Sequence, residues 1–406
     1  MSTLTVHLNG MPVGTLEQDA SGLLRFTYAP EWLERDDAVP LSKMLPLSPD
    51  PYENQHARPF FAGILPEEGP RAAIARILGI SEGNDFAMLE RIGGECAGAV
   101  SLLPEGLQPL HVESRTRVLD DEELVSIIHE LPRRPLMAGE KGIRLSLAGA
   151  QDKLPVIIDG ETVALPLGNT PSTHIIKPEP ERFPGLVANE AFCMELARRV
   201  GLNVAEATIR LIGGTPCIVV TRYDREAGPA GTVRLHQEDF CQTLGRPPER
   251  KYQQEGGPTV RECIALLRDW STTPVLDILA LVDALIFNVL IGNADAHGKN
   301  YSMIYAGGTR RLAPLYDLVS TIAWPGLSTR LAMSIGHGKS VNDLNPAHFK
   351  RMAEECDLGW PMVRDRIRRL ADGLGSVIAT VDEAAVWELV AQRCERMATS
   401  LDSRSK

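Results

Sequence analysis

The sequence predicts an α+β protein in which a small N-terminal module precedes a strand-rich segment and then a longer helical one. The first 235 residues contain hairpin turns at Asn9-Gly10, Asp159-Gly160 and Gly213-Gly214, whereas long apolar segments with helical spacing come later. The 35 glycines and 29 prolines indicate many turns, which a helical bundle would not need. Strands followed by helices predict a β-rich lobe beside a larger helical lobe.

Length and charge set the broad class of the protein. The 406 residues, 44% of them hydrophobic, are enough for two or three domains with packed cores. The formal net charge of -11 argues against a protein that coats nucleic acid by bulk charge. The seven scattered cysteines include no C-x-x-C pair, so neither a zinc site nor a disulfide framework is expected. The first residues lack the plan of a signal peptide, and we expect a cytoplasmic protein.

Residues 1–105 are expected to form the N-terminal α+β module. The Asn9-Gly10 turn closes a hairpin, because both central positions of a type I′ turn need a positive φ angle. Leu23–Tyr28 and Ala99–Leu103 are predicted strands, and Ala72–Leu78 has the apolar spacing of a helix that stops before a glycine. A polar stretch after the second of these strands marks the boundary of the module.

Residues 106–143 are predicted to form a linker with one short helix, whose first turn holds the acidic run Asp120–Glu123. Residues 144–235 should form the strand-rich lobe. A helix over Asn189–Val200 interrupts its strands and is closed by Gly201 as its C-cap. The predicted strands are Lys153–Ile158, Thr162–Leu165, His174–Lys177, Ala207–Ile212 and Ile218–Arg222.

Residues 236–402 form the predicted helical lobe. One of its long apolar segments carries Asp277, Asp283 and Asn288 at helical intervals, so we expect a buried helix there rather than a membrane span. The apolar segments of this lobe are Val260–Trp270, Val275–Ile291, Met362–Leu374 and Glu383–Ala398.

The most informative segment follows the buried helix and reads Ile291-Gly-Asn-Ala-Asp295-Ala-His297-Gly-Lys299-Asn300. Asp295 and Asn300 have the spacing of the catalytic-loop aspartate and the metal-binding asparagine of protein kinases. That chemistry uses a carboxylate to orient the substrate hydroxyl and an amide oxygen to bind Mg²⁺. Lys299 would stabilise charge on the transferred phosphoryl group, and His297 would orient the loop. The alternative is a loop of polar capping residues without a catalytic role.

A second acidic residue, Asp317, follows the apolar segment Leu312–Leu315. Its position after the D-x-x-x-x-N loop matches the second metal-binding aspartate of kinases, although the surrounding sequence is not D-F-G. A simple turn residue is the alternative interpretation. Asn300 and Asp317 are therefore the candidate Mg²⁺ ligands.

Lys177 ends an apolar strand, and the helix that follows it carries Glu190 and Glu195. A strand lysine followed by a helix glutamate matches the kinase ion pair that positions the ATP phosphates. The two glutamates face different ways on the helix, and Glu190 in its first turn is favoured. The alternative is a solvated lysine at a strand end.

Small residues before the first strand of this lobe offer a place for phosphate groups. The segment reads Ser146-Leu-Ala148-Gly149-Ala150-Gln-Asp-Lys153, and its small side chains would let backbone N–H groups approach phosphate oxygens. The sequence has no Walker A loop, no G-x-G-x-x-G after a strand and no G-x-S-x-G. A P-loop NTPase, a Rossmann dinucleotide site and an α/β-hydrolase are therefore disfavoured.

Together these residues make the sequence resemble the HipA family of bacterial serine/threonine kinases, which are the toxins of HipBA-type toxin–antitoxin modules. The resemblance covers nearly the whole chain and implies a two-lobed protein-kinase-like fold with a mostly helical C-terminal lobe. The first module, with its Asn9-Gly10 hairpin and Leu65–Arg71, is similar to the family's N-terminal subdomain. The ordered motifs are Ser146–Lys153, Thr173–Lys177, Asn189-Glu190, Thr221–Arg225, Gln237–Gln242, Asp295–Asn300 and Tyr316-Asp317.

The resemblance implies roles for individual residues. Asp295 would be the catalytic aspartate, and Lys177 would hold the ATP phosphates. Asn300 and Asp317 would bind Mg²⁺, and Ser146 matches the serine that these kinases autophosphorylate. The other implied ATP-binding residues are Ala148, Gly149, Ala150, Gln151, Asp152 and Lys153 in the phosphate loop, Thr221, Arg222 and Tyr223 in the hinge, and His297 and Lys299.

The implied function is that of a toxin kinase that uses ATP and Mg²⁺. Its substrate would be a translation-related protein such as a tRNA-charging enzyme, and autophosphorylation at Ser146 would switch it off. The resemblance also implies a HipB-like helix-turn-helix antitoxin as partner, operator DNA contacted mainly through that antitoxin, and no membrane. Two alternatives stay open: a catalytically silent kinase-like corepressor that acts with a DNA-binding antitoxin, and a small-molecule kinase.

Overall fold

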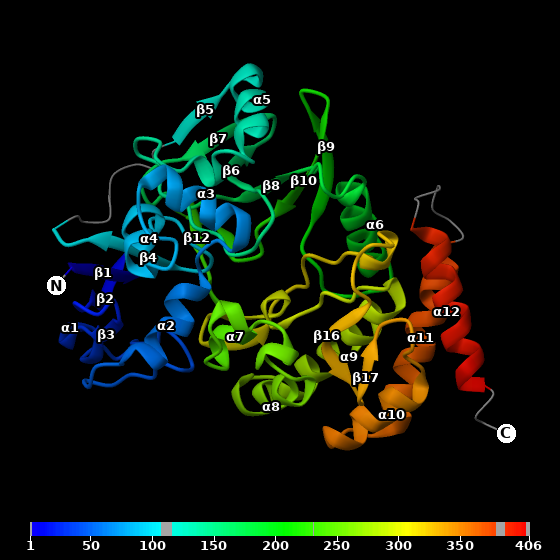
Figure 1. Cartoon of the computed structure of the whole chain (residues 1–406). Helices are drawn as coiled ribbons and strands as arrows, with labels where there is room; N and C mark the ends of the chain where they lie inside the picture. The colour runs from blue at the N-terminus through cyan, green and yellow to red at the C-terminus, as the bar shows by residue number, and fades with distance from the viewer. Residues whose placement is uncertain (1, 107–115, 230, 379–385, 403–406) are drawn as a thin grey trace. The chain divides into compact units, whose positions relative to one another are not determined.

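The computed structural model describes residues 2–106, 116–229, 231–378 and 386–402 (Figure 1). Contacts divide the chain into two compact units. Residues 107–115 of the predicted linker and 383–385 of the last predicted helix lie outside the described residues. Unit 1 comprises Met1–Pro180, Arg210–Pro248 and Ile304–Ala306, and unit 2 comprises Glu181–Ile209, Glu249–Met303 and Gly307–Lys406.

Unit 1 begins with an antiparallel sheet of strand order β3-β2-β1-β4. The predicted hairpin between β1 and β2 is present, with φ angles of 51° at Asn9 and 79° at Gly10. The strands are β1 (Ser2–Leu8), β2 (Met11–Gln18), β3 (Leu24–Tyr28) and β4 (Val100–Pro104). The helices between β3 and β4 are α1 (Pro30–Leu33), α2 (Asn54–Gly63), α3 (Glu68–Leu78) and α4 (Asp85–Ile92).

A second sheet has the strand order β5-β7-β6-β8-β10-β9. In its antiparallel register Lys177 of β8 lies opposite Ile218 of β10. Helix α5 (Asp121–Glu130) begins at a capping box, in which the Asp120 carboxylate accepts a 2.8 Å hydrogen bond from the Glu123 N–H. The strands are β5 (Thr116–Leu119), β6 (Leu154–Asp159), β7 (Thr162–Pro166), β8 (His174–Pro178), β9 (Ala207–Ile212) and β10 (Thr215–Thr221).

One hydrophobic cluster runs through both sheets. It includes Leu4 and Phe26 from the first sheet and Leu154, Ile176 and Val219 from the second. The N-terminal module and the strand-rich segment therefore share a core. The later elements of unit 1 are β11 (Arg225–Gly228), β12 (Gly231–Arg234), β13 (His236–Asp239) and α7 (Phe240–Thr243).

Unit 2 is mainly helical, as the sequence predicts. Among the described residues, α9 (Pro274–Ile291) is long and apolar enough to cross a membrane, but 72% of this stretch is buried inside the protein. Helix α9 contacts α8, α11 and α12, so it serves as a core helix of this unit. The other helices are α6 (Leu186–Arg199), α8 (Val260–Trp270), α10 (Pro346–Glu355), α11 (Trp360–Ile378) and α12 (Trp387–Asp402). The strands that follow α9 are β14 (Ser302–Ala306), whose last three residues belong to unit 1, and β15 (Thr309–Leu312), β16 (Arg330–Ile335) and β17 (Gly338–Ser340).

Candidate active site

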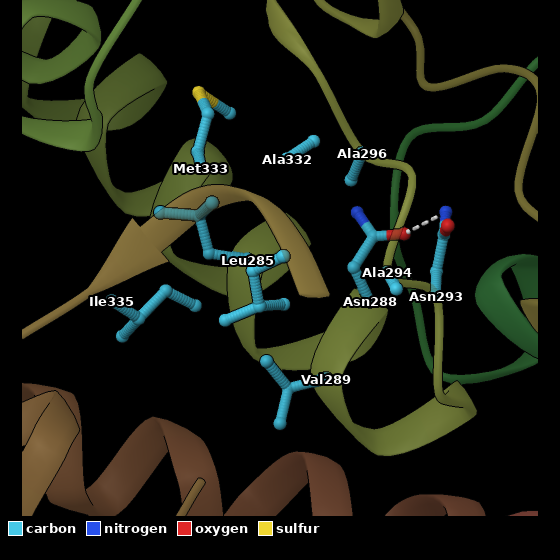
Figure 2. A pocket seen from close by; sticks show the side chains of 10 residues that line it. Leu285, Asn288, Val289, Asn293, Ala294, Ala296, Ala332, Met333 and Ile335 are labelled. Carbon is cyan, nitrogen blue, oxygen red and sulfur yellow. Dashed lines mark hydrogen bonds between the residues drawn. The ribbon is translucent and has the colours of Figure 1, made fainter. Parts of the chain in front are cut away.

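The predicted catalytic loop begins where α9 ends in unit 2. Gly292 closes the helix with a left-handed φ of 76°, and the chain then turns towards Asp295. The Asn293 carboxamide shapes this turn, because its Oδ1 accepts a 2.9 Å hydrogen bond from the Asp295 N–H. Its Nδ2 donates to Asn288 Oδ1 at 2.8 Å, beside a small pocket with mostly apolar walls (Figure 2). The turn is therefore held from α9 by buried amide groups.

Asp295 is exposed, so its carboxylate is accessible from solvent. The Tyr252 hydroxyl donates a 2.9 Å hydrogen bond to Asp295 Oδ1 and so limits the orientations of the carboxylate. The rings of Tyr252 and His297 meet edge to face with centroids 5.3 Å apart. The Lys251 ammonium lies 5.5 Å from the centroid of the Tyr252 ring. Sequence reasoning missed Lys251 and Tyr252, because Tyr252 precedes Asp295 by 43 residues and belongs to no motif.

The structure brings the two candidate metal ligands together. Asn300 Nδ2 donates a 2.9 Å hydrogen bond to Asp317 Oδ2, although 17 residues separate them in the chain. Asn300 Oδ1 accepts a 3.0 Å hydrogen bond from the His297 N–H, which fixes the carboxamide. The short 3₁₀ turn over Gly298–Asn300 carries the asparagine to this position. His297 thus orients the loop through its backbone.

Asp317 adopts a left-handed conformation with a φ angle of 57°. Residues other than glycine seldom adopt this conformation, although aspartate and asparagine tolerate it better than most, and local contacts have to select it. The preceding Tyr316 hydroxyl donates to the Lys299 carbonyl at 2.7 Å and lies 2.8 Å from the Ser302 hydroxyl oxygen. The Leu315 N–H donates to the Asn203 carbonyl at 2.9 Å. These contacts of the two residues before Asp317 help to hold its carboxylate at Asn300.

The residues present fit a magnesium ion that binds together with a nucleotide. Asn300 and Asp317 supply one amide oxygen and one carboxylate, and Mg²⁺ prefers oxygen ligands. No cluster of three or more His, Cys, Asp or Glu side chains suited to a metal occurs in the part of the chain that the structure describes. An ion that also binds phosphate oxygens and water needs only one or two carboxylates from the protein.

The candidate phosphate-binding lysines are buried. Lys177 in unit 1 is 9% exposed and Lys299 in unit 2 is 7% exposed, which argues against a solvated lysine in either place. The helix α6 begins at Leu186, so Glu190 lies beyond its first turn rather than in it, and Glu190 is 1% exposed. Glu195 instead pairs with Arg198 and Arg199 of its own helix, at 2.7 and 2.6 Å. This leaves Glu190 as the better candidate, and its ion pair with Lys177 stays a prediction.

The predicted phosphate loop is closed by its own residues. Lys153 Nζ donates a 2.5 Å hydrogen bond to the Ala148 carbonyl. Gly149 between them has a φ angle of 109°, and a Cβ atom added there would lie 2.6 Å from Lys153 Nζ. Partial burial raises the pKa of Asp152. Gln151 is half-buried and Ala150 is exposed, so the tip of the loop meets solvent.

Ser146 is fully buried at the base of this loop. Its hydroxyl donates a 2.9 Å hydrogen bond to the Ile64 carbonyl, and its N–H donates to the Glu95 carbonyl at 2.8 Å. Leu145 forms an isolated bridge with Glu95 rather than a regular strand. In this conformation the Ser146 hydroxyl is therefore inaccessible to a kinase site.

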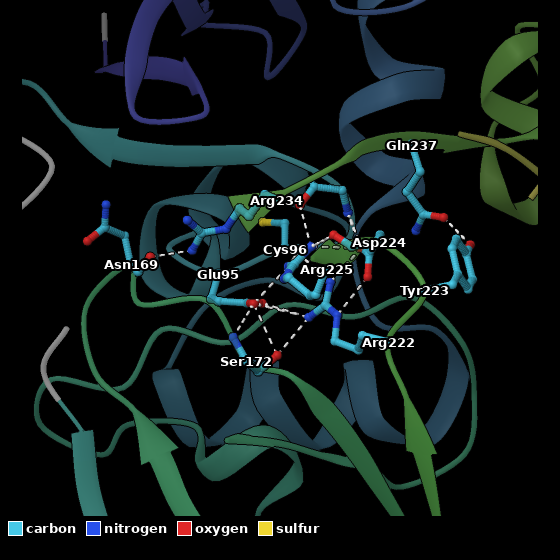
Figure 3. A network of polar contacts seen from close by, with 11 residues as sticks. Glu95, Cys96, Asn169, Ser172, Arg222, Tyr223, Asp224, Arg225, Arg234 and Gln237 are labelled. Atoms are coloured by element: carbon cyan, nitrogen blue, oxygen red, sulfur yellow. Dashed lines mark hydrogen bonds and ion pairs between the residues drawn. The ribbon is translucent and has the colours of Figure 1, made fainter. Parts of the chain in front are cut away.

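The predicted hinge leads into a buried ionic cluster of unit 1 (Figure 3). The Arg222 guanidinium donates to both carboxylate oxygens of Glu95 at 3.1 Å and to those of Asp224 at 2.8 and 2.9 Å. Arg225 adds a 2.9 Å hydrogen bond to Glu95. Burial by itself would raise the pKa of Glu95, but Arg222 and Arg225 lower it to about 2. The Arg222 side chain is thus occupied by the cluster, and the Tyr223 hydroxyl bonds to Gln237 Oε1.

Comparisons with known proteins agree with this geometry. The family model of the HipA-like C-terminal domain matches residues 145–379, and that of the HipA N-terminal domain matches residues 4–103. "Putative kinase Y4mE" of Sinorhizobium fredii is 46% identical over 99% of this chain and 97% of its own length. The "Serine/threonine-protein kinase toxin HipA" of Shewanella oneidensis is 32% identical over 93% of this chain and 89% of its own.

A solved structure extends the likeness to three dimensions. The Shewanella oneidensis toxin–antitoxin complex of HipA, HipB and operator DNA contains a chain that matches with a TM-score of 0.83 and 28% identity. The match covers 98% of this chain and 97% of that one. The α+β fold with a kinase-like body, expected from the order of the motifs, is therefore confirmed. The chain belongs to the HipA family.

Proposed function

We propose that the protein is a serine/threonine protein kinase that uses ATP and Mg²⁺ and acts as the toxin of a toxin–antitoxin module. The observation that carries this proposal is the Asn300–Asp317 pair, 2.9 Å apart, in the same unit as the exposed Asp295. The relatives named as kinases support ATP as the phosphate donor. A pure binding protein would have no need for this amide and carboxylate pair beside an exposed aspartate.

The candidate site residues of unit 2 each have a defined role in this proposal. Asp295, oriented by the Tyr252 hydroxyl, accepts a hydrogen bond from the substrate hydroxyl and aligns it for attack. Asn300 and Asp317 would hold Mg²⁺, which supplies positive charge to the phosphate oxygens when bound. Lys299 adds positive charge from the same loop, where the transferred group becomes more negative. In unit 1, Lys177 would hold the ATP phosphates.

Autophosphorylation at Ser146 would switch the enzyme off. Because the hydroxyl is fully buried, the loop of residues 146–153 has to leave its position before Ser146 can receive a phosphate. The phosphate adds close to two negative charges, and the burial site at the Ile64 carbonyl offers oxygen rather than a donor. The phosphorylated loop cannot return to its buried position, so residues 146–153 can no longer bind the ATP phosphates.

The proposed partner is a HipB-like helix-turn-helix antitoxin. The support is the structural neighbour, which was solved with HipB and operator DNA. The net charge of -11 favours contact with DNA mainly through that antitoxin. The proposed substrate is a translation-related protein such as a tRNA-charging enzyme, and the proposed location is the cytoplasm.

Labelled ATP tests the proposal directly. The unmodified protein, Asp295→Ala and the control Asp269→Ala, which removes an exposed carboxylate from α8, are incubated with Mg²⁺ and labelled ATP. We expect label on Ser146 in the unmodified protein and the control, and none in Asp295→Ala. Phosphoproteomics after controlled expression of the same variants then identifies the substrate. Retained antitoxin binding without any transfer would establish a silent corepressor instead.

A preincubation experiment tests the switch. The unmodified protein and Ser146→Ala are held with Mg²⁺ and ATP, and the kinase activity that remains is measured over time. Only the unmodified protein should lose activity. Equal loss in both proteins would show that Ser146 is not the switch.

A further inference from the structure

Thr321 and Ile322, which follow Asp317 in the chain, contact the turn that precedes Asp295. Thr321 Oγ1 accepts a 2.9 Å hydrogen bond from the Ala294 N–H, next to Asp295, and donates a 3.2 Å hydrogen bond to the Gly292 carbonyl. The Ile322 N–H also donates to the Gly292 carbonyl, at 3.4 Å. The catalytic loop is therefore tied by side chain and backbone to the segment that carries the metal carboxylate.

The same segment is anchored on its other side by α6. Asn189 Nδ2 donates to the Ser320 carbonyl at 3.1 Å, and the Ser320 N–H donates to Asn189 Oδ1 at 2.8 Å. Asn189 is 2% exposed and Ser320 is fully buried, so water does not compete for these bonds. The Cys193 thiol, one turn later in α6, lies 3.6 Å from Asn189 Oδ1 and helps to fix the carboxamide.

Close packing leaves this contact little freedom. A Cβ atom added at Gly292 would lie 2.4 Å from Ile322 Cδ1, so the glycine leaves room for the Ile322 side chain to pack against the turn. The φ angle of 76° at Gly292 independently favours glycine. The Ala294 carbonyl, on the opposite side of the turn, accepts a 2.8 Å hydrogen bond from the Ala332 N–H of β16. The turn before Asp295 is thus clamped between β16 and Thr321.

We propose that Thr321 is a positioning residue, whose hydroxyl sets the distance between Asp295 and the Asn300–Asp317 pair. Phosphoryl transfer depends on the aligned placement of the attacking hydroxyl and the metal-bound phosphate, and Thr321 joins the turn before Asp295 to the segment after Asp317. Asn189 anchors the bridge to α6 through its two hydrogen bonds with the Ser320 backbone. The inference rests on the proposed kinase activity and deepens it.

The test uses a matched set of variants at neighbouring positions. Thr321→Val keeps the shape of the side chain but removes both hydrogen bonds, whereas Thr321→Ser keeps the hydroxyl. Ser320→Ala is the control, because the Ser320 hydroxyl oxygen is buried and makes no hydrogen bond among the described residues. Single-turnover autophosphorylation, Mg-ATP affinity by calorimetry and the melting temperature are measured for each full-length protein. Rates are expressed per Mg-ATP-binding site, so that unfolded protein does not count.

The positioning role of Thr321 predicts a different result for each of these measurements. Thr321→Val should slow transfer by roughly ten- to a hundredfold, because small misplacements of reacting groups cost that much. Its Mg-ATP dissociation constant should stay within about twofold of the original, because the Asn300–Asp317 bond does not involve Thr321. Thr321→Ser should restore the rate, and Ser320→Ala should leave it unchanged.

The outcomes separate this inference from the proposed function. An unchanged rate in Thr321→Val, or a loss of Mg-ATP affinity that accounts for the whole effect, overturns the positioning role alone. If Asp317→Ala binds Mg-ATP as well as the unmodified protein does, the proposed metal site is wrong. If the unmodified protein neither binds Mg-ATP nor transfers phosphate, the proposed function fails and the inference with it.

Discussion

The ionic cluster of unit 1 allows a sharp prediction for Arg222→Met, which keeps an apolar chain of similar reach but removes the guanidinium. The Glu95 Oε2 and Asp224 Oδ1 atoms would lose the Arg222 bonds of 3.1 and 2.9 Å. Other bonds survive, because Arg225 still reaches Glu95 Oε1 at 2.9 Å and the Gly98 N–H still donates to Asp224 Oδ2 at 2.7 Å. Two partly unsatisfied buried carboxylates should therefore remain.

The magnitude follows from these losses. An unsatisfied buried acceptor costs about 1–3 kcal/mol, and breaking a buried ion pair costs about 3–5 kcal/mol. The two considerations agree on a loss of roughly 3–5 kcal/mol in the free energy of unfolding of unit 1. Arg210→Met, which removes an exposed guanidinium from β9, is the matched control and should change this free energy by less than about 0.5 kcal/mol.

The pH dependence identifies the cause of the loss. The pKa of Glu95 is about 2 in the folded protein, against an ordinary value of 4.5. A depressed pKa contributes stability that is present above pH 4.5 and is lost as the pH falls from 4.5 towards 2. The stability difference between Arg222→Met and the unmodified protein should therefore shrink over this range.

Urea unfolding at a series of pH values measures this difference. The signal should come from unit 1, for example by hydrogen exchange of β10, because a long chain need not unfold in one step. A difference that stays constant from neutral pH down to about pH 3 would refute the reasoning, because the guanidinium would then not act through Glu95.

Three further predictions concern single side chains. Asp317→Asn should weaken Mg-ATP binding by roughly tenfold or more, because it removes the charged ligand of the metal pair, while nucleotide binding without Mg²⁺ should hardly change in calorimetry. An equal loss with and without Mg²⁺ would contradict the metal role. Tyr252→Phe should slow single-turnover transfer roughly fivefold, because one hydrogen bond to Asp295 is lost, and an unchanged rate would remove Tyr252 from the site. Burial raises the pKa of Glu238 from 4.5 to about 7, so the folded protein loses stability as the pH rises through this range. Glu238→Gln cannot titrate, and its urea midpoint relative to the unmodified protein should rise between about pH 5 and about pH 8. A constant difference would show that Glu238 keeps an ordinary pKa.

Local patterns predicted the elements well where local physics decides them. The Asn9-Gly10 turn has the positive φ angles that its residues favour, and α9 ends at the glycine that follows its apolar run. Helix α6 is the informative exception, because it begins at Leu186 rather than at Asn189. Asparagine often caps a helix, but Asn189 lies inside the helix and uses its carboxamide on Ser320, 131 residues away.

The candidate site shows the same division. Spacing and order along the chain predict Asp295, Asn300 and Asp317 as site residues. Kinases use an aspartate, an asparagine and a second aspartate in that order. Tyr252 and Thr321 were missed, since their roles come from hydrogen bonds to a loop that is distant in the chain. The motif around Arg222 is visible in the sequence, but its partner Glu95 lies 127 residues away and carries no local signal.

The amino-acid sequence by itself determined the α+β class, the family and the order of the residues proposed for catalysis. Turn formation, helix capping and the choice of chemical groups act within a few residues, so they can be read along the chain. Only the tertiary structure decided that Ser146 is sealed from solvent, that Arg222 is used in a buried cluster and that Thr321 bridges two loops. Burial and hydrogen bonding depend on which distant segments come together, and a buried polar group takes whichever partner the fold places within reach.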